Sequence, residues 1–330
     1  MPKKPIIGIT MGDPAGIGPE VCVKAVSSSE VNHAANPIII GDAQYIENAA
    51  RLIKNNSKIN AIQKIEDAVF KNWIINVLDL NNVPANLAKG QVSAAAGKAA
   101  VEYVFKAIEL AKEKKIDAIT TGPINKEAIH KAGYKYHGHT EILAEKTGTK
   151  NFCMLFVSPE IWVLLVTTHL PLKSVSQALK TSKILEKIKL ANDFMTRVNK
   201  KSPRIGVAGL NPHAGEGGIF GTEEKTIIRP AVEKAKALGI KIEGPVSPDA
   251  IFNLAKANLF DLVVAMYHDQ GLIPLKLLAF NKSVNVTIGL PFVRTSVDHG
   301  TGFDIAGRGY ANPSSMIEAI KVAAHFCRQP

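Results

Sequence analysis

Residues 5–20 read PIIGITMGDPAGIGPE, and the fold class follows from them. The β-branched run 5–10 predicts a strand, and the three glycines and two prolines after it predict a turn before a helix. Such a turn brings backbone amides close to a ligand. The glycines lack the GxGxxG spacing of a dinucleotide-binding fingerprint, so a tight structural turn explains them equally well.

The alternation of short strands and longer helices continues along the chain. Helical spacing of apolar residues appears over 101–111 and 184–191, and a last helix is expected to begin at Pro313 or Ser314. This pattern predicts a largely parallel sheet covered by helices, with an antiparallel hairpin where three residues separate two strands. The predicted strands are 5–10, 37–40, 116–121, 152–157, 161–167, 204–210, 261–265 and 284–288.

The length and apolar content predict two domains. A chain of 330 residues, 46% of them hydrophobic, can bury two cores of ordinary size. We therefore expect two α/β/α domains with a cleft between them. The first is expected to comprise 1–130 plus 280–330, and the second 131–279.

Composition disfavours several classes of protein. The net charge of +11 is spread along helical segments, and aromatic residues make up only 6% of the chain, which disfavours a nucleic-acid-binding surface. No apolar run approaches the roughly 20 residues of a membrane-spanning helix, and residues 1–14 lack the apolar region of a secretory signal. Cys22, Cys153 and Cys327 share no CxxC spacing, so a reducing, cytoplasmic location is expected.

Three of the nine histidines follow predicted strands closely. They are His169, His213 and His268. The carboxyl ends of strands converge on the ligand crevice of an α/β sheet, so three imidazoles there could meet around one cation. A catalytic divalent metal such as zinc suits that ligand set. Hydrogen-bonded structural histidines are the alternative, and the pattern alone leaves both open.

Three further segments suit ligand binding but also occur as ordinary connections. Residues 120–126 (TTGPINK) join a strand to a helix. At 138–141 (GHTE) a helix is expected to begin, with Thr140 as its cap and His139 facing an anion. Residues 298–309 form a glycine-rich loop before the last helix.

Taken together, these segments resemble one known family. The ordered set comprises MGDPAGIGPE from Met11, TGPINK from Thr121, GHTE from Gly138, LNPHAGEGG from Leu210, YHDQG from Tyr267 and NVTIGLPFVRTSVDHGTGFDIAG from Asn285. Their order and spacing, over residues 5–325, resemble the 4-hydroxythreonine-4-phosphate dehydrogenase family. The GIGPE segment and the last loop are also similar to isopropylmalate and isocitrate dehydrogenases. This similarity implies an isopropylmalate dehydrogenase-like fold, in which GxGxxG is not expected.

The resemblance implies a homodimer with its active site at the subunit interface, NAD as cofactor, and one divalent cation (Zn, Mg, Co or Mn) per subunit. His169, His213 and His268 match the family's metal ligands, which the two subunits share. The positions that match its substrate-binding residues are His139, Thr140, Lys276, Asn285 and Arg294. The loop positions that match cofactor binding are Asp298, His299, Gly300 and Asp304.

The implied reaction is the NAD-dependent oxidation and decarboxylation of 4-phosphooxy-L-threonine to 3-amino-2-oxopropyl phosphate, a step in vitamin B6 synthesis. An alternative is a relative that oxidises a sugar acid phosphate, D-threonate or D-erythronate 4-phosphate. The group that takes the hydroxyl proton stays open, with Asp249, Asp269 and a lysine as candidates. The resemblance, together with the lack of an arginine cluster in the loop apart from Arg308, predicts that NAD is preferred over NADP.

Overall fold

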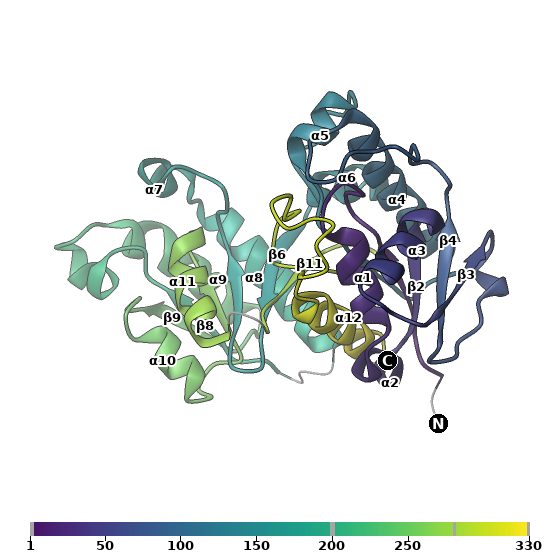
Figure 1. Ribbon diagram of the computed structural model, residues 1–330. Coiled ribbons are helices and arrows are strands. Elements are labelled where there is room, and N and C mark those ends of the chain that lie inside the picture. The colour runs from purple at the N-terminus through teal and green to yellow at the C-terminus, as the bar shows by residue number, and fades with distance from the viewer. Residues whose placement is uncertain (1–2, 199–201, 280–281, 329–330) are drawn as a thin grey trace. The chain divides into compact units, whose positions relative to one another are not determined.

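A computed structural model describes residues 3–198, 202–279 and 282–328. The chain divides into two compact units, one made of Met1–Lys150 with Leu290–Arg328 and the other of Asn151–Gly289. Each unit combines a sheet with surrounding helices, so the predicted α/β class is confirmed (Figure 1). No helix in the described ranges has both the length and the apolar character needed to cross a membrane.

The first unit contains six strands in the order β3-β4-β2-β1-β5-β12. All five pairings are parallel. Its elements are β1 (Ile6–Thr10), α1 (Gly18–Val26), α2 (Ser29–Ala34), β2 (Asn36–Gly41), α3 (Ala43–Leu52), β3 (Lys58–Ile62), β4 (Ile74–Asp79), α4 (Ala94–Lys112), β5 (Ala118–Thr121), α5 (Lys126–Lys131), α6 (His139–Thr147), β12 (Val293–Ser296) and α12 (Ser314–Cys327).

The second unit has the strand order β11-β6-β7-β10-β8-β9. β6 pairs antiparallel with both β7 and β11, which confirms the predicted hairpin. The elements are β6 (Cys153–Val157), β7 (Trp162–Leu165), α7 (Val175–Ala178), α8 (Thr181–Arg197), β8 (Ile205–Ala208), α9 (Arg229–Ala237), β9 (Ile242–Val246), α10 (Ile251–Lys256), β10 (Leu262–Ala265), α11 (His268–Ala279) and β11 (Val284–Ile288).

Central strands of both sheets are covered on both faces. All residues of β5, β8 and β10 are buried, whereas a half-exposed strand would alternate between buried and exposed residues. Continuous burial is typical of parallel strands between helical layers. The α/β/α layering within each unit therefore follows from the apolar, β-branched composition of these strands.

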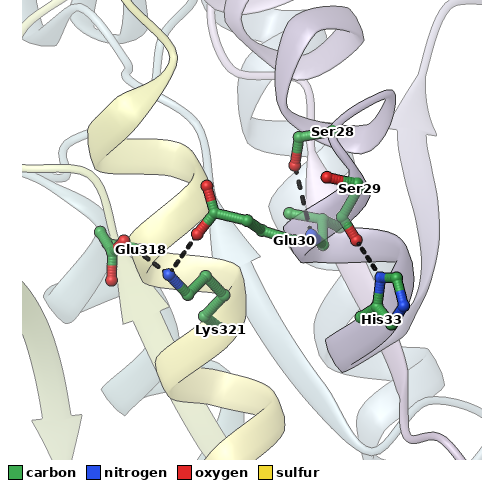
Figure 2. A network of polar contacts seen from close by, with 7 residues as sticks. Ser28, Ser29, Glu30, His33, Glu318 and Lys321 are labelled. Carbon is green, nitrogen blue, oxygen red and sulfur yellow. Dashed lines mark hydrogen bonds and ion pairs between the residues drawn. The ribbon is translucent and has the colours of Figure 1, made fainter.

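The last helix closes the first unit by packing on β12, β5 and β1. Figure 2 shows its polar attachment to α2, where Lys321 Nζ donates to Glu30 at 2.6 Å and to Glu318 at 2.8 Å. Ser28 caps α2 by accepting from the backbone N–H of Val31. The chain end is thus fixed to a helix from the beginning of the sequence.

Two expectations about the fold need correction. The eight predicted strands omitted β3, β4, β9 and β12, of which β12 carries Arg294. β12 has only four residues, and its parallel pairing with β5 makes it a strand. The expected boundaries near 130 and 280 differ from those at 150–151 and 289–290, because Ile142 and Leu143 of α6 pack into the first unit's core. Residue 280 itself lies outside the described residues.

Candidate functional site

The second unit brings three histidine-bearing junctions to one end of its sheet. β10 lies between β7 and β8 and is parallel to both, so the three strands end at the same edge. His169 follows β7, His213 follows β8, and His268 is the first residue of α11 after β10. The sequence pattern predicted this convergence at carboxyl ends.

His169 and His268 lie next to each other, with ring centroids 5.7 Å apart. The Nδ1 atom of His268 is 2.7 Å from Oδ1 of Asp269. A carboxylate that holds one ring nitrogen fixes the orientation of the imidazole and directs the other nitrogen outward. This arrangement suits a metal ligand.

His213 lies in a loop of unusual backbone conformation. Residues 213–217 all have positive φ, and three of them are not glycine: His213 at 50°, Ala214 at 52° and Glu216 at 42°. Non-glycine residues adopt this left-handed region at an energetic cost, and they cluster at functional sites. The sequence predicted a loop here, but not this conformation.

The donor chemistry fits a divalent cation, although one chain does not gather a full ligand set. Within the described ranges, no group of three or more His, Cys, Asp or Glu side chains could hold a metal ion. Paired imidazoles with an orienting carboxylate are nevertheless ligands that transition metals take in proteins. Shared ligation by two subunits stays a prediction.

Both carboxylates considered as the base are already hydrogen bonded. Asp269 contacts His268, and Asp249 accepts from the Ser247 hydroxyl at 2.5 Å. The Ser247 hydrogen bond, and to a smaller extent His213, lowers the pKa of Asp249. Asp249 therefore remains ionised at neutral pH and is a weaker base than an ordinary aspartate.

The other second-unit candidates lie on α11 and β11. Lys276 is half-buried on α11, eight residues beyond His268, or about 12 Å along a helix. Asn285 lies on β11, and its Oδ1 is buried without a hydrogen-bond partner among the described residues. An orphaned buried acceptor of this kind suits a ligand donor.

In the first unit, the candidates gather where β1, β5 and β12 end. Arg294 of β12 is only 2% exposed, and its Nη2 donates to Thr121 Oγ1 of β5 at 2.6 Å. Burial lowers the pKa of Arg294 to about 9, so the side chain still carries its charge at pH 7. A buried arginine at strand ends suits an anionic ligand.

His139 lies close to Arg294 and is neutral at neutral pH. Burial, followed by the charge of Arg294, lowers the pKa of His139 well below its ordinary value. Its ring also hydrogen bonds to the Gly122 backbone, while Nε2 is buried without a partner among the described residues. The expected capping role of Thr140 is wrong: Gly138 is the cap residue, with no side-chain bond, and Glu141 instead accepts from the His137 backbone at 2.7 Å.

The two glycine-rich segments of the first unit contact each other. The Ile17 backbone N–H donates to the Thr301 carbonyl at 2.9 Å. Glu20 of α1 accepts from the Gly307 backbone at 2.7 Å, and Lys24 donates to the carbonyls of Gly309 and Ala311. The 11–20 turn thus supports the 298–309 loop.

The proposed cofactor-binding residues lie on this supported loop. The Asp298 backbone donates to Ser315 Oγ at 3.0 Å, and Asp304 is exposed. His299 Nδ1 carries the proton and donates to the Gly300 carbonyl, because a carbonyl oxygen can only accept. The other ring nitrogen, Nε2, is buried and has no partner in the part of the chain described. An unpaired buried acceptor suits a ligand donor, and NAD binding by this loop stays a prediction.

Asp13 is a buried group that the sequence pattern did not single out. Its backbone donates to the Pro123 carbonyl at 2.8 Å, and Oδ1 accepts from Ala15. Oδ2 is buried with no partner among the described residues, and burial raises the pKa of Asp13 to about 6. Its position between glycines and prolines was the available signal.

The chain resembles known proteins over nearly its whole length. Residues 33–323 match the family described as "Pyridoxal phosphate biosynthetic protein PdxA". The chain is 47% identical over 323 residues to the D-threonate 4-phosphate dehydrogenase of Cupriavidus necator, covering 98% of this chain and 97% of the relative.

Solved structures of similar proteins extend over the same length. One is the 4-hydroxythreonine-4-phosphate dehydrogenase from Klebsiella pneumoniae, with a TM-score of 0.94, 43% identity and 99% of each chain covered. Another is a terephthalate 1,2-cis-dihydrodiol dehydrogenase from Burkholderia xenovorans, with a TM-score of 0.69, 30% identity and 98% of each chain covered. The chain belongs to the PdxA family and is a dehydrogenase.

Proposed function

We propose that this protein oxidises and decarboxylates D-threonate 4-phosphate with NAD⁺, as a homodimer with a shared divalent metal. The observation that carries the substrate choice is the 47% identity, over nearly the whole chain, to a relative of that name. The site chemistry agrees, because a four-carbon acid phosphate has two anionic ends and two hydroxyl groups.

The residues of this chain match those needs. Arg294 and Lys276 supply cations for the anionic ends. His139, neutral and with a free Nε2, is suited to a substrate hydroxyl, and the Asn285 amide oxygen accepts from another. The loop 298–309, held by Glu20 and Lys24, is proposed to bind NAD⁺.

The reaction balances without any further reactant. Oxidation at C3 sends a hydride to NAD⁺ and releases the hydroxyl proton, which gives a 2-hydroxy-3-oxo acid. Loss of CO₂ from this β-keto acid, with uptake of one proton at C2, leaves dihydroxyacetone phosphate and NADH. His169, His213 and His268 are the proposed metal ligands. A divalent metal held by these histidines would supply Lewis-acid chemistry, which would favour loss of the C3 hydroxyl proton and polarisation of the ketone.

The shared metal site is supported by an exposed apolar strip on α11. Ile273 is 65% exposed and Leu277 86% exposed, on the helix that begins at His268. Residues four apart lie on one face of a helix. A second copy covering this face would contact the helix that carries His268.

A second candidate substrate is 4-phosphooxy-L-threonine. It is favoured by the TM-score of 0.94 to a 4-hydroxythreonine-4-phosphate dehydrogenase. This substrate carries an ammonium at C2 in place of a hydroxyl, and its product would be 3-amino-2-oxopropyl phosphate. Only this substrate needs an acceptor for a full positive charge.

NADH formation with three substrates distinguishes these functions. D-threonate 4-phosphate, D-erythronate 4-phosphate and 4-phosphooxy-L-threonine are compared with NAD⁺ and NADP⁺, before and after chelation. We expect the highest kcat/KM with D-threonate 4-phosphate and NAD⁺, loss of turnover on chelation, and recovery with Co²⁺. A higher kcat/KM with 4-phosphooxy-L-threonine supports the second candidate. Unchanged turnover in a metal-free preparation contradicts the metal site.

A further inference from the structure

The His213 loop needs outside support to keep its backbone conformation. Each non-glycine residue in the left-handed region costs about 1–2 kcal/mol, and His213, Ala214 and Glu216 all lie there. Such a segment persists only where surrounding contacts over-determine it. The contacts that hold this loop therefore also set the position of the His213 imidazole.

The carboxylate of Glu224 supplies that support. Glu224 is 3% exposed, and its Oε1 accepts from the backbone N–H groups of Leu210 and Asn211, both at 2.7 Å. Oε2 accepts from the Asn211 side chain at 3.0 Å. A Cβ built on Gly215 would lie 2.7 Å from Oε2, so the loop wraps closely around the carboxylate.

Glu224 also begins a π-helical turn, Glu224–Ile228, that leads into α9. Such turns are rare and occur frequently at functional sites. The described ion pairs include none with Glu224. Backbone and amide N–H dipoles satisfy its charge instead, so the carboxylate is committed to organising the loop.

A second buried side chain links this loop to the His268 junction. Gln270 of α11 is 9% exposed; its Oε1 accepts from the Met266 backbone at 2.6 Å, and its Nε2 donates to the Gly209 carbonyl at 2.7 Å. Thr167 Oγ1 donates to the Met266 carbonyl at 2.8 Å. One chain of hydrogen bonds therefore connects the backbone just before His169, His213 and His268.

We propose that Glu224 and Gln270 are positioning residues that hold His213 in register with His169 and His268. The inference rests on the proposed metal function of these histidines. Metal sites require ligands within about 0.5 Å of the productive geometry, and loops achieve that only when their support is rigid. Both side chains act through the backbone that carries the ligands.

Glu224→Gln and Glu223→Gln make a matched pair. The adjacent Glu223 accepts from the Asn211 side chain at 2.9 Å, and among the described residues its carboxylate accepts no hydrogen bond from the loop backbone. In Glu224→Gln, an NH₂ group replaces one carboxylate oxygen. This NH₂ group faces N–H donors of Leu210 or Asn211, so at least one hydrogen bond to the loop is lost. Co²⁺ affinity is measured by titration calorimetry, and ligand geometry by the visible absorption of bound Co²⁺. We expect Glu224→Gln to bind Co²⁺ about 10- to 100-fold more weakly with an altered spectrum, and Glu223→Gln to stay within about twofold.

Gln270→Glu keeps the test decisive if Glu224→Gln fails to fold. The variant keeps the shape of the side chain but turns an oxygen toward the Gly209 carbonyl, so the same weakening and spectral change are expected. Thermal unfolding confirms the fold of each variant. Wild-type affinity and spectrum in both folded variants overturn the inference while leaving the metal site intact. Absence of Co²⁺ binding by the wild type overturns the proposed metal function itself.

Discussion

Asp13 carries a free-energy cost that depends on pH. Burial raises its pKa from 3.8 to about 6, so the folded state binds this proton more tightly than the unfolded state does. The free energy of unfolding therefore falls as pH rises between about 4 and about 6, by at most roughly 3 kcal/mol. Above that range the buried carboxylate is ionised in the fold.

Asp13→Asn should remove this dependence, because an amide cannot ionise and can still accept from Ala15. We expect the stability of the variant relative to the wild type to increase between pH 4.5 and pH 7.5, by about 2 kcal/mol. Urea unfolding at both pH values measures it. Asp67→Asn, at an exposed position, is the control. An equal difference at both pH values contradicts the prediction.

Arg294 is proposed to hold an anionic end of the substrate. It is among the largest fully buried side chains, so alanine would leave a cavity and confuse activity with folding. Arg294→Met nearly preserves the side-chain volume. It should lower kcat/KM roughly 10- to 150-fold, which corresponds to a loss of about 1.5–3 kcal/mol of transition-state stabilisation. Lysine should recover only part of the loss. Steady-state kinetics measures this, and a change below twofold in folded Arg294→Met would exclude the role.

At the scale of the elements, α4 packs against α5 at Gly97, where the two backbones are too close to accommodate any side chain. A Cβ on Gly97 would collide with the backbone of Ala128 and Ile129. In a free helix, alanine is about 1 kcal/mol more favourable than glycine. Backbone atoms cannot move aside as the end of a flexible side chain can. The close contact with α5 therefore outweighs the higher helix propensity of alanine at position 97.

Gly97→Ala is therefore expected to destabilise the protein by about 1–3 kcal/mol. Lys98→Ala, at the next and exposed position of α4, should change stability by less than about 0.5 kcal/mol. Denaturant unfolding followed by circular dichroism compares them. A stabilised Gly97→Ala variant would mean that the two helices can separate at little cost.

The loop 298–309 depends on α1 for its order. Lys24 Nζ donates to Gly309 at 2.8 Å and to Ala311 at 2.7 Å. Lys24→Met should keep the packing of the aliphatic stem and lose both bonds, so amide hydrogen exchange should become about tenfold faster over 298–311. Lys112→Met, at an exposed position, should leave exchange there unchanged. Unaltered exchange in the Lys24 variant would mean that other contacts order the loop.

At the scale of the whole molecule, the proposed dimer predicts a linked loss of assembly and metal. Leu277→Asp should place a charge on the exposed apolar face of α11, raise the monomer fraction and weaken Co²⁺ binding together. Leu238→Asp, at another exposed leucine, is the matched control. Sedimentation velocity and Co²⁺ titration measure the two effects. A Leu277→Asp monomer that binds Co²⁺ normally would place the complete site in one chain.

Local pattern in the sequence was sufficient for much of this architecture. Runs of buried β-branched residues predicted β1, β5, β8 and β10, because their composition reflects coverage on both faces. The antiparallel hairpin followed from a three-residue connection. The placement of histidines directly after strands predicted which residues end up at one edge of the second sheet, since parallel strands share their carboxyl ends.

Non-local contacts determined the rest. β12 is a strand because β5 pairs with it, and its Arg294 is buried by neighbours distant in sequence. The left-handed His213 loop depends on Glu224, fourteen residues beyond Leu210, and no local propensity predicts it. The raised pKa of Asp13 likewise comes from burial by segments far along the chain. Patterns of period 2 and 3.6 encode which face of an element is apolar, but desolvation, strain and hydrogen-bond partners arise only when those faces meet.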